Sequence, residues 1–369
     1  MKTLFAATLL VPGLLSAQLI IPEIAYDSTP NLLKLTDRVP MGEAVGVATD
    51  SKGNIYVYTR TGTTYVSEGT SRAFESGGAR LFEFDASGKF VREIGKQMYG
   101  FVFAHAVRVD PEDNIWVVDE GSNMIIKFNQ QGRVVMTMGR KSENLRIPEP
   151  VPVAAAPAAA GGRGEGGGRG AAGMGRGGAP VGAPVGAGRD TDVFDRPTDV
   201  AWDAAGDIFV SDGYGNSRVA KFDKEGRFIK SWGSRGTAPG QFNTPHTIAA
   251  DAQGNVYVGD RGNRRIEVFN NDGEFKAQYL NVGAPWAVCI SPGPHQYLYS
   301  SNSNGTGDME NGEIYRMELN GKILGKFGTA GKLLKEFGSV HEMDCRNPNE
   351  LFVGEITNWR VQKLTLHVN

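Results

Sequence analysis

The sequence lacks several features that would assign it to a common class of protein. Its 39 Lys and Arg residues nearly balance 41 Asp and Glu, and a net charge of -2 gives no reason to expect nucleic acid or an anionic membrane as the partner. Beyond the N-terminal segment, no apolar stretch approaches the length of a membrane span. No long stretch shows helical periodicity, and there are only two cysteines and five histidines. Helical folds and membrane-spanning helices are therefore disfavoured.

The first residues, MKTLFAATLLVPGLLSAQ, have the composition of a secretory signal peptide. Lys2 supplies the positive charge, an apolar run follows, and the small residues Ser16 and Ala17 precede Gln18. A buried strand or a retained anchor is the alternative. We expect residues 1–17 to be cleaved and the mature protein to be secreted or periplasmic.

The rest of the chain consists of six similar units. Each unit has an apolar strand, a turn containing Gly-Asn or Asp-Asn, and a second apolar strand, followed by two more strands such as those in RVAKFDKEGRFIKSWG. A period near forty residues with four strands per unit is typical of a β-propeller. We predict an all-β, six-bladed propeller in a single domain over residues 18–369. The N-terminal segment NLLKLT (residues 31–36) is expected to supply the outer strand of the last blade.

Three of the histidines occupy the same place in alternate units. His105, His246 and His341 each stand fourteen residues before an acidic residue that closes a short apolar run. The same spacing separates Val45 from Thr59, Thr198 from Asp212, and Trp286 from Ser300. A single histidine at a strand start is more often a hydrogen-bonded structural residue. In a ring of six, however, these three would meet at the axis with threefold spacing, and three imidazoles with an open position predict a zinc site.

Residues that follow the second strand of a unit lie on the same face of the ring as the histidines. We call this face the mouth. Arg60 in the first unit and Arg261 in the fourth come directly after the fourteen-residue mark, and would face each other across the channel. Guanidinium groups bind carboxylates in a fork. Tyr214, in the same loop of the third unit, would have a lowered pKa beside a metal and two cations, and could act as a base. The ordinary alternatives are ion-pair partners for the arginines and packing for the tyrosine.

Other notable residues receive structural assignments. The recurring Asp119, Asp212 and Asp260 are expected to accept backbone N–H groups at turns. His295 and His367 lack the register and are expected at the surface.

Cys289 and Cys345 would lie on inner strands of adjacent blades. An oxidising compartment permits a disulfide, but we expect two buried thiols.

Residues 142–193 interrupt the join between the second and third units. This Gly-, Ala- and Pro-rich segment has almost no large apolar residue, so it cannot bury enough surface to offset its ordering entropy. We expect a disordered loop, because the repeat resumes in phase at residue 196. Its arginines could bind an anion, although a solvated tether is favoured.

The units resemble NHL-type propeller repeats and, more narrowly, the peptidyl-α-hydroxyglycine α-amidating lyases, also called peptidylamidoglycolate lyases. The resemblance spans roughly residues 43–365 apart from the insertion, and is carried by motifs such as AHAVRVDPEDNIWVVD, PTDVAWDAAGDIFVSDGYGNSR, TPHTIAADAQGNVYVGDRGNRRI and HEMDCRNPNELFVGE. It implies zinc on His105, His246 and His341, a catalytic Tyr214, and active-site Arg60 and Arg261.

The resemblance also implies a structural calcium ion in the channel. Its ligands would be the backbone carbonyls of Val47 and Val107 and the carboxylate of Glu342, where the family has an aspartate. A second departure is Gly215, because the family has a cysteine after the tyrosine and a disulfide that braces this loop. The third is the insertion, which would emerge at the mouth and could act as a lid or limit which substrates enter.

The implied reaction cleaves the C–N bond of an N-acyl-α-hydroxyglycine to an amide and glyoxylate, with zinc polarising the hydroxyl group and Tyr214 taking its proton. The partner would be a small-molecule or peptide substrate that carries a carboxylate. Two alternatives remain. One is a non-catalytic binding propeller, and the other is a lactonase-type hydrolase, a class that usually holds its metal with carboxylates and asparagine.

Overall fold

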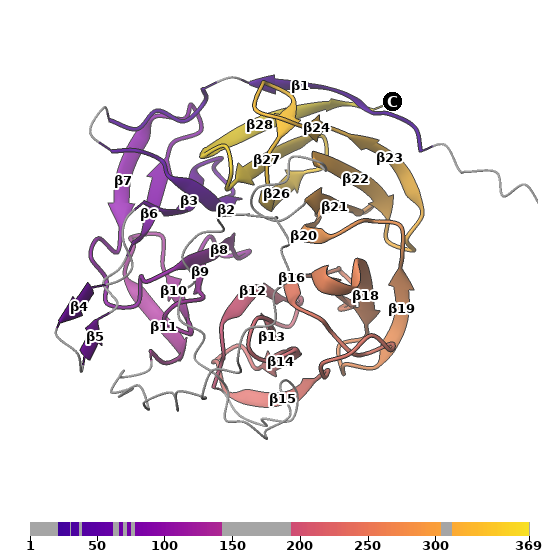
Figure 1. The fold of residues 1–369 in the computed structure, drawn as a ribbon, viewed down its shortest axis with the longest axis horizontal. Helices are drawn as coiled ribbons and strands as arrows, with labels where there is room; N and C mark the ends of the chain where they lie inside the picture. Colours follow the sequence, from indigo (N-terminus) through magenta and orange to yellow (C-terminus); the bar gives the residue numbers. More distant parts are fainter. Residues whose placement is uncertain are drawn as a thin grey trace, which may run out of the picture.

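The computed structural model describes residues 21–29, 31–36, 39–61, 66–68, 72–74, 78–141, 193–303 and 312–368. Six four-stranded antiparallel sheets surround a central axis as blades, which confirms the predicted all-β, six-bladed propeller (Figure 1). The expected signal peptide, and all but the last residue of the insertion expected at 142–193, lie outside the described residues.

In blades 1 to 3 the strands follow one another from the axis outward in chain order. Blade 1 contains β2 (Glu43–Thr49), β3 (Ile55–Arg60), β6 (Ala79–Phe84) and β7 (Phe90–Ile94). Blade 2 contains β8 (Ala104–Val109), β9 (Ile115–Asp119), β10 (Met124–Phe128) and β11 (Val134–Gly139). Blade 3 contains β12 (Pro197–Trp202), β13 (Ile208–Asp212), β14 (Arg218–Phe222) and β15 (Phe228–Trp232).

Blades 4 to 6 also run from the axis outward. Blade 4 contains β16 (Pro245–Ala250), β17 (Val256–Asp260), β18 (Arg265–Phe269) and β19 (Phe275–Tyr279). Blade 5 contains β20 (Pro285–Ile290), β21 (Tyr297–Ser303), β22 (Gly312–Glu318) and β23 (Ile323–Phe327). Blade 6 contains β26 (Val340–Asn347), β27 (Glu350–Glu355), β28 (Arg360–His367) and β1 (Ala25–Thr29). Two short pairs, β4 (Val66–Glu68) with β5 (Arg72–Phe74) and β24 (Thr329–Ala330) with β25 (Glu336–Phe337), lie outside the blades.

An aspartate-led turn ends the innermost strand in several blades. The Asp50 carboxylate accepts the backbone N–H groups of Lys52 at 2.9 Å and Asn54 at 2.8 Å. Asp110 and Asp251 make the same pair of bonds in blades 2 and 4. The side chain thus satisfies backbone donors that the turn leaves without strand partners. This turn explains why these units read as two strands separated by a short polar segment.

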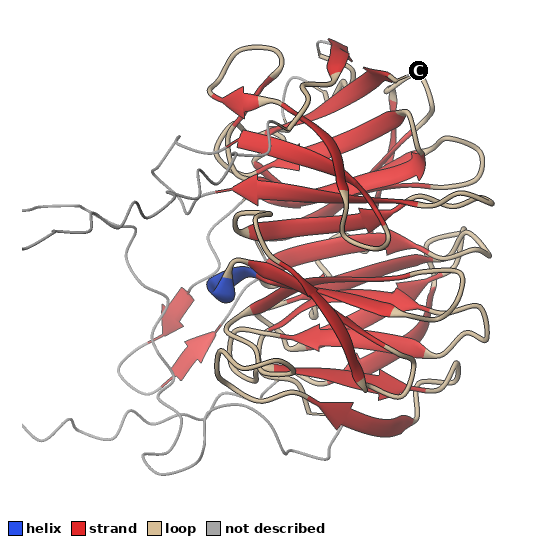
Figure 2. Ribbon diagram, turned by 90° about the vertical axis from the view of Figure 1, so that its right-hand side faces the viewer, coloured by secondary structure: helices blue, strands red, loops and turns tan. Residues whose placement is uncertain are grey.

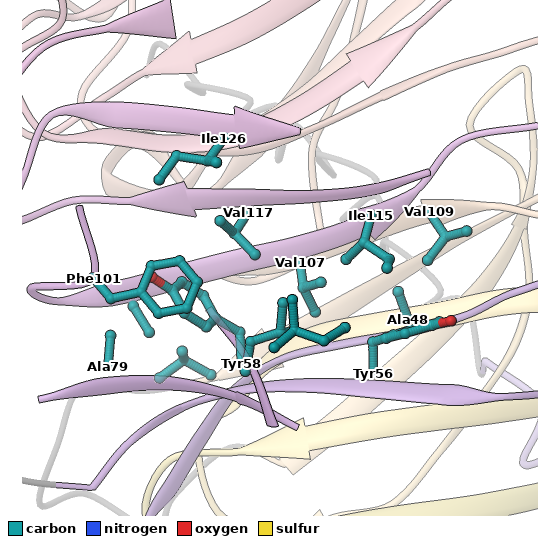
Figure 3. Close-up of a cluster of buried hydrophobic side chains, with 14 of the residues drawn as sticks. Ala48, Tyr56, Tyr58, Ala79, Phe101, Val107, Val109, Ile115, Val117 and Ile126 are labelled. Atoms are coloured by element: carbon teal, nitrogen blue, oxygen red, sulfur yellow. The ribbon is translucent and has the colours of Figure 1, made fainter. Parts of the chain in front are cut away.

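The cores lie between neighbouring blades, where the apolar faces of two sheets meet. Between blades 1 and 2, Tyr58, Phe101, Val107, Val117 and Ile126 form one such buried cluster (Figure 3). Full burial of a large apolar side chain contributes roughly 1.5–3 kcal/mol. Because each blade is covered on both faces by its neighbours, the ring depends on contacts between blades rather than on any single sheet.

The ring closes where the N-terminal segment joins the last blade. β1 pairs antiparallel with β28, from Ala25 opposite His367 to Thr29 opposite Lys363 (Figure 1). An N-terminal strand in blade 6 is therefore confirmed, but its assignment to residues 31–36 was wrong. Those residues lie on blade 1, where Leu32 and its neighbouring leucines pack against the core. An outer strand is partly exposed and needs few apolar residues, so the leucine-rich segment was the wrong candidate.

Cys289 and Cys345 form a disulfide between β20 and β26, which corrects the expectation of two thiols. Their positions on inner strands of adjacent blades were predicted, and the two Cα atoms lie 6.0 Å apart, within the range that a disulfide spans. The bond joins blade 5 to blade 6, next to the point where the ring closes.

The only helix among the described residues is the 3-10 turn η1 (Arg261–Asn263), which Figure 2 shows at one face of the ring. Within that same part of the chain, no helix is long and apolar enough to cross a membrane.

Candidate metal and substrate site at the channel mouth

The three aligned histidines each sit at a β-bulge of an innermost strand. The register with the neighbouring strand shifts between Ala104 and Ala106 in β8, between Pro245 and Thr247 in β16, and between Val340 and Glu342 in β26. The residue at each shift is the histidine. A bulge leaves its extra residue unpaired and re-aims that side chain. The bulges thus turn all three imidazoles toward the axis.

The imidazoles form a nearly equilateral group. The ring centroids of His105, His246 and His341 are 4.6–4.8 Å apart, and one ligand nitrogen from each ring lies within 4.8 Å of the others. All three side chains are buried. Burial is the largest cause that lowers the pKa of each imidazole well below its usual range, so the rings are neutral at neutral pH. Neutral imidazole is the form that binds a metal.

Backbone carbonyls of neighbouring blades fix which ring nitrogen points to the axis. His246 Nδ1 lies 2.7 Å from the Trp286 carbonyl oxygen, and His341 Nδ1 lies 2.8 Å from that of Val45. Nδ1–H donates to the carbonyl, which leaves Nε2 as the free acceptor. Beside His105, the Thr198 backbone makes a smaller contribution that opposes the lowering of the pKa by burial, and no group among the described residues lies at hydrogen-bond distance from His105 Nδ1. The donor set therefore fits a zinc ion, with three Nε2 atoms available.

Tyr214 covers this group from the mouth. Its hydroxyl oxygen lies 3.0 Å from His246 Nε2, 3.5 Å from His105 Nε2 and 3.3 Å from the Arg261 guanidinium. The predicted lowering of its pKa depends on a bound metal and stays a prediction, while the protein's own groups act in the opposite direction. Burial raises the pKa of Tyr214, and the lowering by Arg261 and Arg60 does not offset it.

The Tyr214 loop is braced without the disulfide of the family that it resembles. The Tyr214 N–H donates to the Arg196 carbonyl at 3.3 Å, and the Arg196 guanidinium donates back to the Tyr214 carbonyl at 3.0 Å. A Cβ on Gly215 would lie 2.1 Å from the Asp195 carboxyl carbon, so a larger residue at this position would displace the exposed Asp195 side chain. Arg196 was not singled out from the sequence.

The two predicted arginines lie at the mouth but in different surroundings. Arg60 is engaged, because its Nε donates to the Ala104 carbonyl at 2.8 Å, its guanidinium pairs with Glu43 at 3.3 Å, and it stacks 3.6 Å from the Phe103 ring centroid. Arg261 stacks 4.5 Å from the Trp286 ring centroid and 5.2 Å from that of Tyr214. Among the described residues, none places a carboxylate within ion-pair distance of Arg261.

Glu120 is a further mouth residue that the sequence analysis missed. It follows Asp119 just as Arg60 and Arg261 follow the equivalent positions of their own blades. Burial raises the pKa of the Glu120 carboxyl, while Arg60 and Arg196 lower it. The register that identified the arginines would also have identified this carboxylate.

The structural assignments made from the sequence are confirmed. Asp119 accepts the N–H groups of Val102 and Ser122. Asp212 and Asp260 accept those of residues 195 and 243 in the same way. His295 and His367 are exposed and lie beside Glu318 and Asp27, respectively.

The residues predicted to hold calcium lie together just beyond the histidines. Glu342 Oε2 accepts the backbone N–H groups of Val47 at 3.2 Å and Val107 at 3.0 Å. Its Oε1 lies 3.0 Å from the Arg108 guanidinium, a residue that the sequence analysis did not single out. A cavity of about 10 Å³, lined by the three histidines together with Arg108 and Glu342, separates the two layers.

Comparison with known proteins agrees with the fold. A family described as a 6-bladed beta-propeller matches residues 192–342. The chain is 27% identical over 350 residues to Peptidyl-glycine alpha-amidating monooxygenase of Mus musculus. The aligned region covers 88% of this chain but only 30% of the relative. It is 26% identical over 362 residues to Peptidyl-alpha-hydroxyglycine alpha-amidating lyase 1 of Drosophila melanogaster, covering 89% of this chain and 58% of the relative. The chain thus spans only part of the length of these relatives.

Among solved structures, a gluconolactonase from Xanthomonas campestris superimposes with a TM-score of 0.51 at 14% identity, covering 89% of each chain. At that identity the likeness concerns the fold alone. The chain is a six-bladed β-propeller that resembles the amidating lyases in sequence.

Proposed function

We propose that this chain is a zinc-dependent lyase that cleaves the C–N bond of N-acyl-α-hydroxyglycines and releases an amide and glyoxylate. The observation that carries the proposal is the convergence of His105 Nε2, His246 Nε2 and the Tyr214 hydroxyl beneath Arg261. A metal-binding group, a proton acceptor and a cation that no carboxylate of the described residues pairs with thus lie within one substrate's reach. Relatives named as amidating lyases over most of the chain support the same reaction class.

The parts played by the residues follow from their positions. His105, His246 and His341 would hold zinc, which supplies a Lewis acid for the substrate hydroxyl and positive charge near the Tyr214 phenol. Arg261 would bind the substrate carboxylate as a fork. Tyr214 would accept the hydroxyl proton as the C=O bond of glyoxylate forms and the C–N bond breaks. The departing nitrogen takes up one proton, which Tyr214 can return, so the reaction is balanced without a co-reactant.

Glu120 would act on the substrate side of the same mouth. A partly buried carboxyl group near three arginines can accept an N–H group of the substrate amide. It would thereby orient the bond that breaks, while Arg261 holds the opposite end of the substrate.

We propose that the protein works outside the cytosol and that residues 1–17 are removed. The disulfide between Cys289 and Cys345 supports this, because such bonds persist in oxidising compartments. We also propose that residues 18–369 form a single propeller domain.

A pair of histidine variants tests the proposal. His246→Ala should lose bound zinc together with glyoxylate release from α-hydroxyhippurate, while its circular dichroism spectrum remains that of the wild type. His295→Ala is the matched control, because His295 lies at the surface and should leave zinc and activity unchanged. Full zinc occupancy in the His246, His105 and His341 single variants would refute the metal site.

The same protein preparation separates the alternatives. Hydrolysis of a gluconolactone without glyoxylate release would favour a lactonase, and absence of both activities with no bound metal would favour a binding propeller. Among the described residues, the three histidines are the one group of metal-ligating side chains with suitable spacing, which favours the lyase.

A further inference from the structure

The channel contains a second layer of charged residues beyond the histidines. Arg108 lies three positions after His105, while Asp199 and Glu342 follow Thr198 and His341 directly. The Asp199 and Glu342 side chains are buried, and that of Arg108 is 15% exposed. Burying two carboxylates near one another is costly unless a cation compensates them.

The Arg108 guanidinium supplies that cation through five contacts. It binds the Asp199 carboxylate in a bidentate manner, with Nε 2.9 Å from Oδ1 and Nη2 2.6 Å from Oδ2. Its Nε also lies 3.0 Å from Glu342 Oε1. Its Nη1 donates to the Met343 carbonyl at 3.1 Å and its Nη2 to the Val288 carbonyl at 3.4 Å. One side chain from blade 2 thus contacts blades 3, 5 and 6 directly.

The two carboxylates extend the network to the remaining blades. Asp199 Oδ2 accepts the Thr247 hydroxyl at 2.9 Å and the Ile248 N–H at 3.1 Å, both from blade 4. Glu342 Oε2 accepts the Val47 N–H of blade 1 at 3.2 Å. All six blades are therefore joined through a single guanidinium and its two carboxylate partners.

These residues do not fit the calcium ion that the family resemblance implies. Calcium takes six to eight oxygen ligands. Here one Glu342 oxygen accepts two backbone N–H groups, and the other faces the Arg108 guanidinium at 3.0 Å as an ion pair without a hydrogen bond, so a calcium ion on that oxygen would lie against a fixed positive charge. Val47 and Val107 present N–H donors to this carboxylate, and the carbonyls of Met343 and Val288 accept from the guanidinium.

We propose that Arg108 is a built-in cation that takes the place of a structural calcium ion. It ties the six blades at the axis. Asp199, Thr247 and Glu342 of this network directly follow Thr198, His246 and His341 in the sequence, so the network also positions the layer that carries the imidazoles. The stability of the ring is accordingly independent of calcium. This inference concerns stability and stands apart from the lyase reaction.

Thermal melting of the full chain tests the proposal. The protein is stripped of metal, reloaded with zinc alone, and melted with and without millimolar calcium. The wild type should melt at the same temperature in both conditions. Arg108→Ala should melt several degrees lower without calcium and recover part of the loss with calcium, because oxygen ligands replace the guanidinium contacts.

Arg80→Ala is the matched control, because Arg80 makes an equivalent fork with Glu93 inside blade 1, away from the axis. It should show no calcium response. Arg108→Lys, which keeps the charge but loses the fork, should fall between the wild type and Arg108→Ala.

A wild-type melting temperature that rises with calcium would overturn the proposal, and so would an Arg108→Ala variant with no calcium response. If Arg108→Ala does not fold under any condition, the wild-type comparison and the Arg108→Lys variant still decide the question.

Discussion

At the residue scale, the site depends on the orientation of each imidazole as much as on its presence. The sequence register identified His105, His246 and His341, as well as Tyr214 and the two arginines, because equivalent positions of a ring must share one face. It could not show that the carbonyls of Val45 and Trp286 hold two of the rings by Nδ1. Those bonds arise between blades, and no pattern within one unit encodes them.

Tyr214→Phe tests the proton-transfer role. Phenylalanine keeps the ring that packs beside His105 and His246, so folding and zinc content should not change. Glyoxylate release from α-hydroxyhippurate should fall by a factor of about 10² to 10⁴, the usual contribution of a general base or acid. Wild-type turnover in this variant would exclude tyrosine as the base.

The two arginines should respond differently to substitution by lysine. Arg261 has no carboxylate partner among the described residues, so Arg261→Lys should raise the KM for α-hydroxyhippurate by roughly tenfold or more, a loss of about 1.4 kcal/mol or more. Arg60 already contacts Glu43 and Phe103, so Arg60→Lys should lower the melting temperature more than Arg261→Lys does. Equal effects of the two variants on KM would show that both arginines bind the carboxylate.

Glu267 provides a pH-dependent test of stability that does not involve the site. Burial raises the pKa of Glu267 to about 7, despite a contact of 3.0 Å with Arg265. The folded state therefore holds this proton more tightly than the unfolded chain, whose carboxyl has a pKa near 4.5. The Glu267 contribution to the free energy of unfolding should fall as the pH rises from about 4.5 to about 7.

Urea unfolding of the wild type and Glu267→Gln across this range measures that contribution. Glutamine does not titrate, so the difference in unfolding free energy between the two proteins should shift against the wild type as the pH rises. A constant difference between pH 4.5 and 7 would contradict the raised pKa.

At the element scale, local patterns predicted the strands and turns but not every pairing between distant segments. The turns that begin with Asp50 and Asp110 are local, so the sequence pattern predicts them directly. The partner of β28 is separated from it by most of the chain, and residues 25–29 have no strong apolar pattern. The pairing of Cys289 with Cys345 likewise depends on the spacing between blades, which composition cannot supply.

The insertion should be dispensable for folding. Residues on either side of it already meet without its help, because Met138 of blade 2 and Phe194 before blade 3 share one buried cluster with Phe222. Replacing residues 150–188 with a short Gly/Ser linker should leave the melting temperature within a few degrees, since loop length has only a weak entropic effect. Loss of soluble protein would show that the segment contributes to packing.

At the scale of the whole molecule, the ring combines three means of closure. β1 completes blade 6, the Cys289–Cys345 disulfide joins blades 5 and 6, and the Arg108 network joins all six blades at the axis. A native disulfide typically contributes about 2–4 kcal/mol to the free energy of unfolding. A ring held in this way keeps its blades in fixed positions, so that side chains from blades 1, 2, 3, 4 and 6 can form one site at the mouth.

Glyoxylate release titrated against zinc tests the central claim most directly. The full chain is stripped of metal, zinc is added stepwise, and glyoxylate produced from α-hydroxyhippurate is measured at each step. A single site formed by His105, His246 and His341 predicts that activity rises linearly and stops at one zinc per chain. Glyoxylate release that needs no zinc, or that is absent at every zinc concentration, would contradict the proposed lyase.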